Sequence, residues 1–237
     1  MRKILFASAL ALGLAGTAAA QNDKQKTLEG NGNLVTREVA VSSFDALKAS
    51  GVYELKLSQG SKESVKIEAD ENLQELFLVR NDGNKLVIEM KKLENTNLKT
   101  KNKIRVYVTF NKLKEVDLST VGNVSSEEQL SFDNLQLKNR SVGNVDLSFT
   151  ANKVDISNTS VGNVVLRGKA DNAIVKNSGV GSLEAGSFLV QTMNIENTGI
   201  GSAEVNAARE LKVKDSTMGK VKNKGAATAR RLNKVQI

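Results

Sequence analysis

One pattern, Ser119-Thr-Val-Gly-Asn-Val124, recurs through the second half of the chain at intervals of about twenty residues. It returns as Arg140-Ser-Val-Gly-Asn-Val145, Thr159-Ser-Val-Gly-Asn-Val164, Ser178-Gly-Val-Gly-Ser-Leu183, Thr198-Gly-Ile-Gly-Ser-Ala203 and Ser216-Thr-Met-Gly-Lys-Val221. The glycines shared by all six copies lie 18–21 residues apart and are Gly122, Gly143, Gly162, Gly181, Gly201 and Gly219. Such a near-constant period is typical of a repeat protein whose units stack on one another.

Apolar residues alternate with other residues on both sides of each glycine. Val154 and Ile156 precede Gly162, and Val164 and Leu166 follow it. The residue directly before each glycine is apolar as well, and we count it with the core: Val121, Val142, Val161, Val180, Ile200 and Met218. A period of two on both sides of a fixed glycine predicts short strands joined by tight corners.

Each repeat has only about five apolar side chains, too few to enclose a core by itself. The copies must therefore stack and share one core, with strands of the same direction about 4.8 Å apart. This predicts an all-β parallel solenoid with about 18–21 residues per coil and regular repeats over residues 113–224. Helical repeats, leucine-rich repeats and calcium-binding nonapeptide coils are not indicated, because the residues that fix those folds are missing.

A polar column runs four residues before the glycines. Its members are Asn139, Asn158, Asn177, Asn197 and Asp215, with Leu118 in the first copy. We expect these side chains to point inward at a corner and to hydrogen-bond the backbone of their own and neighbouring coils, each bond contributing about 1 kcal/mol. The glycine column needs only a positive φ or a close backbone approach. A polar groove for a ligand is the alternative for the asparagine column.

The start of the chain resembles an export signal. Two cations, Arg2 and Lys3, precede an apolar run that ends before Ala18 and Ala20. Residues 1–20 are therefore predicted to be a cleavable signal peptide and not a transmembrane anchor, since the run is shorter than the roughly 20 residues that span a bilayer. The mature chain is then expected in the periplasm, outside the cell or on its surface.

After the signal, residues 21–33 are polar and predict a flexible leader. Alternating segments from residue 34 to residue 110 predict strands, with a hairpin turn at Asn81-Asp-Gly-Asn84 and Asp70 as the N-cap of a helical turn. We expect one domain over residues 34–237. Whether its first strands are irregular coils or a separate cap is left open.

The amino-acid composition excludes most common types of catalytic site. The 237 residues include no Cys and no His, so disulfides, Cys/His zinc sites, thiol nucleophiles and imidazole-dependent triads are excluded. Catalysis would need paired carboxylates on neighbouring coils, and Asp146, Asp155 and Glu196 do not recur in one column. We therefore expect no catalytic, cofactor-binding or metal-binding residues.

Positive charge is concentrated at the C-terminal end. Loss of Arg2 and Lys3 with the signal reduces the net charge from +8 to +6. From Arg209 onward nine basic residues accompany two acidic ones, a net +7, whereas residues 21–208 carry −1. This end could meet an anionic surface, or its cations could protect an exposed strand edge. Nucleic acid is not an expected partner, because aromatic residues are only 4% of the chain.

Several stretches together resemble a known family. They are Phe44-Asp-Ala-Leu-Lys-Ala-Ser-Gly-Val52, Val65-Lys-Ile-Glu-Ala-Asp70, Leu86-Val-Ile-Glu89, Ile104-Arg-Val-Tyr-Val-Thr109 and Leu113-Lys-Glu-Val-Asp-Leu-Ser-Thr-Val-Gly122. The chain from about Val39 to Val221 is similar to the putative auto-transporter adhesin, head GIN domain family of exported bacterial proteins, formerly a domain of unknown function and common in Bacteroidetes. Asn111 departs from it, since the family often carries Pro there. The resemblance implies a right-handed β-helix and supplies no catalytic residues.

These observations favour a non-catalytic binding or adhesion-like protein of the cell envelope or surface. A long solenoid offers extended faces to an envelope component, a glycan or another protein. Two alternatives stay open: a carbohydrate-active β-helix enzyme, by analogy of fold alone, and a purely structural periplasmic accessory protein.

Overall fold

The computed structural model describes residues 26–216 and 218–232. This part of the chain is all-β, which confirms the predicted class, and its one helix is the short 3-10 helix η1 (Glu71–Leu76). The strands of the first half are β1 (Lys26–Glu29), β2 (Leu34–Val39), β3 (Ala46–Val52), β4 (Glu54–Gln59), β5 (Ser64–Asp70), β6 (Phe77–Asp82), β7 (Lys85–Met90), β8 (Thr96–Lys99) and β9 (Arg105–Phe110). Those of the second half are β10 (Glu115–Val121), β11 (Val124–Ser126), β12 (Leu130–Asn139), β13 (Val145–Asn158), β14 (Val164–Asn177), β15 (Leu183–Asn197), β16 (Ala203–Asp215), β17 (Val221–Asn223) and β18 (Ala229–Arg231).

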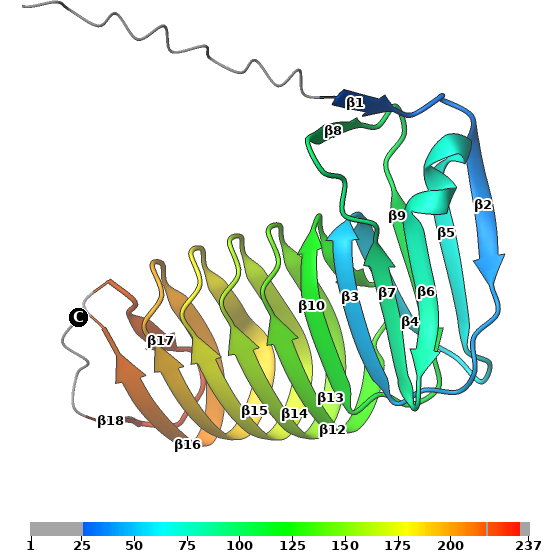
Figure 1. The fold of residues 1–237 in the computed structure, drawn as a ribbon. Coiled ribbons are helices and arrows are strands. Elements are labelled where there is room, and N and C mark those ends of the chain that lie inside the picture. Colours follow the sequence, from blue (N-terminus) through cyan, green and yellow to red (C-terminus); the bar gives the residue numbers. More distant parts are fainter. Residues whose placement is uncertain (1–25, 217, 233–237) are drawn as a thin grey trace, which may run out of the picture.

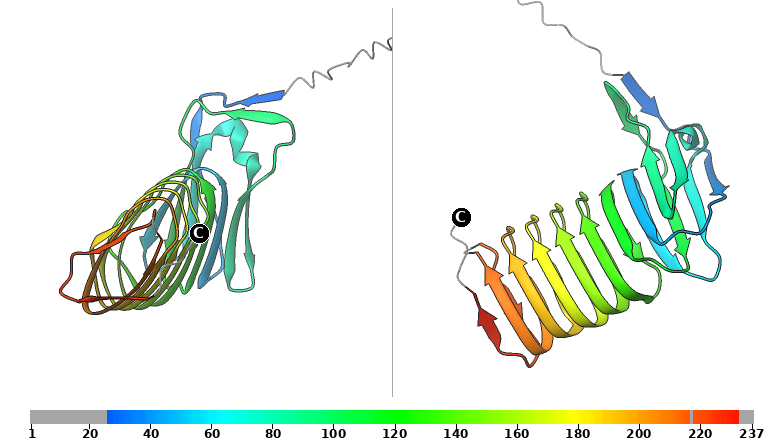
Figure 2. Two further views of the ribbon diagram at one scale, coloured as in Figure 1. Left: turned by 90° about the vertical axis from the view of Figure 1, so that its left-hand side faces the viewer. Right: turned by 60° about the horizontal axis from the view of Figure 1, so that its bottom comes forward.

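Sixteen of these strands form one large mixed sheet that curls nearly onto itself (Figures 1 and 2). From β12 to β16 each strand pairs in parallel with the next. Val154 is level with Ala173, which is level with Met193 and then with Leu211. Because level residues are one sequence repeat apart, each repeat makes one coil, and successive coils stack along the molecule.

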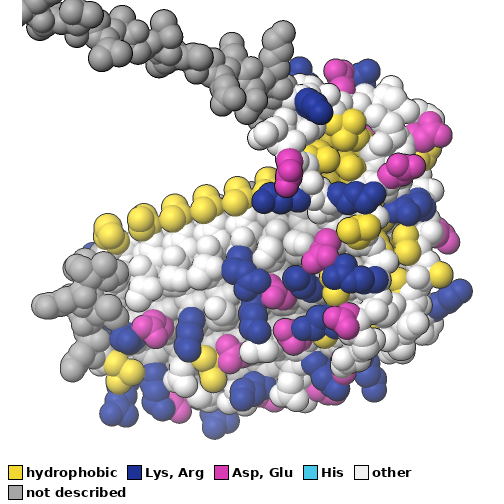
Figure 3. All heavy atoms as spheres, viewed as in Figure 1, with side chains coloured by type: hydrophobic (Ala, Val, Ile, Leu, Met, Phe, Trp, Pro, Cys, Tyr) yellow, Lys and Arg dark blue, Asp and Glu magenta, His cyan; other side chains and the backbone are white. Residues whose placement is uncertain are grey.

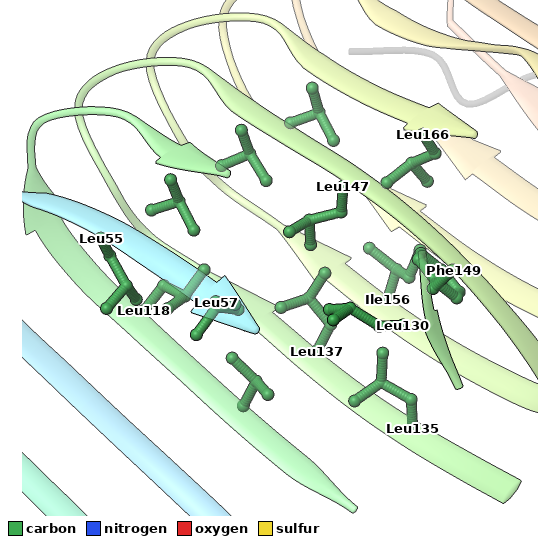
Figure 4. Close-up of a cluster of buried hydrophobic side chains, with 14 of the residues drawn as sticks. Leu55, Leu57, Leu118, Leu130, Leu135, Leu137, Leu147, Phe149, Ile156 and Leu166 are labelled. Carbon is green, nitrogen blue, oxygen red and sulfur yellow. The ribbon is translucent and has the colours of Figure 1, made fainter. Parts of the chain in front are cut away.

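Each coil has two faces that meet at two corners. In β13 the buried side chains alternate from Val145 to Ala151 and again from Val154 to Asn158. Between these two runs lie two exposed residues, Asn152 and Lys153, which form the second corner; the glycine forms the first. The inward side chains of both faces make the core, where Leu147, Phe149 and Ile156 lie (Figure 4).

The residues directly before the corner glycines point outward, so their predicted place in the core is wrong. Val121, Val142, Val161, Val180, Ile200 and Met218 are 48–58% exposed. The five from Val121 to Ile200 each follow an inward residue, such as Ser141 or Ser160, which is 1% exposed. Alternation along the strand then turns the next side chain toward solvent.

The first coil lies far from the others in the sequence. Strands β3 and β4 pair in parallel with β10 and β11, so Val52 is level with Val121 and Leu55 with Val124. Between Gln59 and Glu115 the chain passes to the other side of the first coil, forms β5 to β9 there and then returns to form β10. The repeat therefore has an additional member, residues 44–59, that lacks the corner glycine and carries Tyr53 in its place.

The strands of this excursion combine both pairing directions. β6 and β7 form the hairpin predicted around Asn81–Asn84, and β5 is antiparallel to both β2 and β9. β7 and β9 instead extend the two faces of the first coil in parallel. The antiparallel β5 is thus not an early coil, whereas β7 and β9 continue the stacking.

The expected flexible leader is wrong for residues 26–33. β1 pairs in parallel with β8, which lies in the polar segment 91–103. Asn31 and Asn33 bond to Asn72 and Glu71. Backbone pairing between two polar segments orders both, without the apolar alternation that sequence reading needs. The predicted signal peptide, residues 1–20, and residues 21–25 lie outside the described residues.

Asp70, at the end of β5, is hydrogen-bonded to the segment between β8 and β9. It is the N-cap residue of η1, as predicted, but its fully buried side chain makes no hydrogen bond to the helix. It accepts hydrogen bonds from Asn102 Nδ2 at 2.5 Å and from the backbone N–H of Lys101 at 3.1 Å. The Asn102 amide, with the backbone N–H groups beside it, holds the pKa of Asp70 below its ordinary value in spite of burial.

We expect the corner glycines to tolerate no side chain. Gly162 has φ +135° and a Cβ there would overlap the carbonyl oxygen of Gly143, so Gly162→Asn should lower the free energy of unfolding by at least about 3 kcal/mol. Gly83 has φ +59° with open space around it, and the same change there, Gly83→Asn, should be nearly neutral. Urea unfolding of both variants measures this, and equal losses would contradict it.

We expect Asp70 to make stability depend on acid pH. A carboxylate whose pKa is lowered by folding stabilises the folded state above its ordinary pKa of about 4, and that contribution is lost as the pH falls through the folded value. The stability gap between the unsubstituted chain and Asp70→Asn should therefore be largest near neutral pH and shrink below about pH 4. Unfolding midpoints across this range test it, with the exposed Asp171→Asn as control; a constant gap would contradict the role of Asp70.

Candidate functional site

The asparagine column lies in one buried line inside the glycine corner. Asn139 Nδ2 donates to Asn158 Oδ1 at 2.8 Å, Asn158 Nδ2 to Asn177 Oδ1 at 2.7 Å, and Asn177 Nδ2 to Asn197 Oδ1 at 2.7 Å. These side chains are at most 5% exposed. A ligand groove would need the same amide groups to be accessible, so the geometry speaks against that alternative.

Both ends of the column differ from its middle. Asn197 Nδ2 donates to the carbonyl oxygen of Gly219 at 2.8 Å and not to Asp215. Asp215 instead accepts from Arg231 and from the backbone N–H of Val221. At the other end Leu118 is fully buried and begins the column with an apolar side chain. The structure therefore brings four of the five predicted polar residues into one chain of bonds and sets Asp215 beside it.

The glycines bring successive corners into close contact. Gly122, Gly143, Gly162, Gly181 and Gly201 have φ between +130° and +143°. At each of them an added Cβ would overlap a carbonyl oxygen of the preceding coil, which for Gly122 is that of Tyr53. Gly219 has no such positive φ, but its Cβ would lie 2.8 Å from the carbonyl oxygen of Gly199.

A second polar column, not predicted, lies on the outside of the same corner. Asn123 Oδ1 accepts from the backbone N–H of Asn144, Asn144 Oδ1 from that of Asn163, and Asn163 Oδ1 from that of Ser182, each at 3.0 Å. The recurring Gly-Asn dipeptide is the sequence signal for it. Asparagine side chains thus hydrogen-bond neighbouring coils to each other on both sides of the glycine.

The outward apolar residues at this corner form a continuous row that we call the corner ridge. It consists of Val52, Val121, Val142, Val161, Val180, Ile200 and Met218, each 47–58% exposed. Parallel bridges join its neighbouring members from Val121 to Ile200. Figure 3 shows the ridge as a line of hydrophobic side chains along the upper edge of the coils, with uncharged surface beside it.

The opposite edge of the stack carries a hollow of about 630 Å³ that we call the corner hollow. β9 pairs with β4 on one side of the first coil, and β10 pairs with β3 on the other side. Residues 111–114 connect β9 directly to β10, and the hollow lies beside this connection. The second corner of the first coil is therefore missing. Gln59 bridges the gap: its Nε2 donates to the carbonyl oxygens of Asn111 and Ser131, and its Oε1 accepts from Ser131 N–H at 2.8 Å.

Most polar side chains of the corner hollow have no partner in the described chain. Those without a side-chain hydrogen bond or ion pair are Asn111, Lys112, Ser131, Asp133, Asn134, Gln136, Lys153 and Asp155. Lys114 differs, since its Nζ lies 2.7 Å from Asp45 Oδ2. That hydrogen bond lowers the pKa of Asp45 and raises the pKa of Lys114. The hollow thus offers amide, carboxylate and ammonium groups to a ligand above the buried side chains of Phe132 and Leu135.

The basic C-terminal residues lie on the last coils, around β16 to β18. Four of them are paired: Lys212 with Glu210, Lys214 with Glu196, Lys224 with Glu204, and Arg231 with Asp215. Arg209, Lys220, Lys222 and Arg230 have no ion pair in residues 26–216 and 218–232, and Lys234 lies outside that range. No helix in the described residues is long and apolar enough to cross a bilayer.

We expect the buried amide chain to be a main source of coil stability. Asn158→Ala removes the partner of Asn139, of Ser160 and of Asn177 together, so the free energy of unfolding should fall by about 2–4 kcal/mol. The exposed Asn172→Ala, at the second corner, should change it by less than about 0.5 kcal/mol. Chemical unfolding of both variants measures the difference; an unchanged Asn158→Ala midpoint would remove the structural role assigned to the column.

Solved structures share this arrangement. A putative adhesin from Bacteroides fragilis is 26% identical, with a TM-score of 0.73 over 86% of this chain and 100% of that one. A putative adhesin from Parabacteroides distasonis is 20% identical, with a TM-score of 0.64 over 87% of this chain and 96% of that one. A putative lipid binding protein from the same organism is 17% identical, with a TM-score of 0.60 over 88% and 100% of the two chains. The last two show the fold alone.

No curated protein matches the chain. The profile described as putative auto-transporter adhesin, head GIN domain, matches residues 43–227, which contain the first coil, the excursion and every corner glycine. The chain belongs to this family.

Proposed function

We propose that this protein is an exported, non-catalytic binding protein of the cell envelope or surface, in which residues 34–237 fold as one right-handed parallel β-helix. Export is supported by the signal-like residues 1–20 and by membership of an adhesin family. Right-handedness is supported by the general rule for parallel strands joined by crossovers, and the in-register parallel coils support the solenoid.

The corner hollow carries the binding part of this proposal. Most of its amide and charged side chains, including those of Asn134 and Gln136, have no side-chain hydrogen bond or ion pair in the described residues, so a ligand that displaces the water around them does not have to break internal bonds. A saccharide matches them, because its ring hydroxyls both donate and accept hydrogen bonds, as Asn134 and Gln136 do. A hollow of about 630 Å³ is also within the size range of small-ligand sites.

Catalysis is the less favoured alternative. Asp133 and Asp155 both line the corner hollow, and a glycosidase needs two carboxylates. One of the two must stay protonated as a general acid, which requires a water-excluded environment. Asp133 is exposed at the second corner, where water surrounds it. A purely structural accessory protein would leave the unpaired groups of the hollow without a use.

A glycan screen with the purified secreted chain tests the proposal. We expect micromolar binding of at least one envelope-derived oligosaccharide, and Asn134→Ala combined with Gln136→Ala should weaken it at least about tenfold. Asn194→Ala, an exposed amide on the same face outside the hollow, should bind as the unsubstituted chain does.

Three outcomes would contradict parts of this proposal. Binding that survives the double substitution would move the site away from the hollow. Failure of every saccharide to bind would favour the structural role. Release of reducing sugar that disappears in both Asp133→Asn and Asp155→Asn would make the protein an enzyme.

A further inference from the structure

The corner ridge is apolar in every coil, unlike the other outward columns. A column on the neighbouring face runs through Gln136, Asp155, Ile174, Asn194 and Lys212, which are level with one another and share no chemistry. The ridge holds Val, Ile or Met at all seven levels, although about half of each side chain is exposed. A contiguous exposed apolar row of this kind marks an interaction surface.

We propose that the corner ridge binds the corner ridge of a second copy of this chain, with the two ridges antiparallel about a two-fold axis at Val161. The side chains of the ridge are spaced by one strand separation, about 4.8 Å, over seven levels. Only a partner with the same period can match such a row along its full length. A second copy has that period, and a two-fold axis makes the contact self-complementary.

Charge favours a second copy at this surface. Two copies carry the same net positive charge, which opposes their association, so an uncharged contact surface favours the pairing of identical chains. The columns beside the ridge are almost free of charge: one contains Thr159, Ser178 and Thr198, and the other Asn144, Asn163 and Ser182. The exceptions are Arg140, which is paired with Asp117 at 2.6 Å, and the two ends of the second column, Glu54 and Lys220.

The antiparallel direction follows from the two ends of the molecule. The C-terminal end carries a net +7 from Arg209 onward, and parallel copies would place two such ends side by side. At the other end, β1 and β8 rise above the line of the ridge (Figure 1). Two parallel copies would bring both of these caps to one place, whereas antiparallel copies separate both the caps and the basic ends.

This arrangement fixes the register of the contact. Val161 is the fourth of the seven ridge residues and meets itself across the axis. Val142 then faces Val180 of the partner subunit, and Val121 faces Ile200 of the partner subunit. The stripe is narrow and lies at the small end of specific interfaces, so we expect dimerisation at micromolar concentration.

Cysteine cross-linking tests the contact directly, since the chain contains no Cys. Under mild oxidation Val161→Cys should give a disulfide-linked dimer in high yield, because residues beside a two-fold axis come within the roughly 7 Å Cα separation that a disulfide allows. Val142→Cys and Val180→Cys should each cross-link poorly alone and well when mixed. Lys176→Cys, an exposed control on one face, should not cross-link.

The other outcomes overturn the proposal. Efficient cross-linking of Val142→Cys with itself would mean parallel ridges, and a yield for Val161→Cys no higher than for Lys176→Cys would mean no ridge contact. Light scattering gives a second measurement: the unsubstituted chain should dimerise with concentration, and Val161→Lys should stay monomeric with an unchanged unfolding midpoint. A monomer at all concentrations whose binding to phosphatidylcholine vesicles is lost in Val161→Lys would instead assign the ridge to a lipid surface.

Discussion

Close packing of the backbone at the glycine corner sets the register of the whole stack. Gly143 donates its N–H to the carbonyl oxygen of Val161, Gly162 to that of Val180, and Gly181 to that of Ile200, all at 2.9 Å. Only glycine fits at these positions, because any Cβ would overlap the backbone of the preceding corner. Once these corners are fixed, most positions of the repeat lie level with their counterparts in the next coil and form columns, with register shifts only within the β14–β15 and β15–β16 pairs.

Because the corner positions form columns, the same residue type can satisfy the same backbone groups of the turn in every coil. At the glycine corner the chain changes direction within a few residues. The backbone N–H and C=O groups of this turn need hydrogen-bond partners on its buried side and on its solvent side. Asn158 and its counterparts supply them inside, and Asn144 and its counterparts supply them outside. In the residues that the structure describes, no buried side-chain nitrogen or oxygen atom lacks a partner. The coils thus meet the hydrogen-bonding needs of their buried polar groups without help from disulfides, since the chain contains no Cys.

Sequence reading succeeded where information repeats and failed where it does not. The period of about twenty residues predicted the strands, corners and inward Asn158 column, because six copies display each position several times. The same pattern wrongly placed Val161 and its counterparts in the core. An apolar residue beside a turn is easily taken for a core residue when the small residue before it is not recognised as the inward one. The pairing of Lys26 with Thr96 and the loss of one second corner near Gln59 were not predictable. Both depend on contacts between segments that share no pattern.

The corner ridge and the corner hollow lie on opposite edges of the coils, one at the glycine corner and one at the second corner. Two copies joined along their ridges would therefore leave both hollows open and facing away from each other. Such a dimer could bind two sites on one polysaccharide or surface, where the second contact forms at the high effective concentration set by the first. Weak single-site affinity is then compatible with firm attachment. A repeat fold suits this use, because the same columns that stabilise the stack also extend its outer edges.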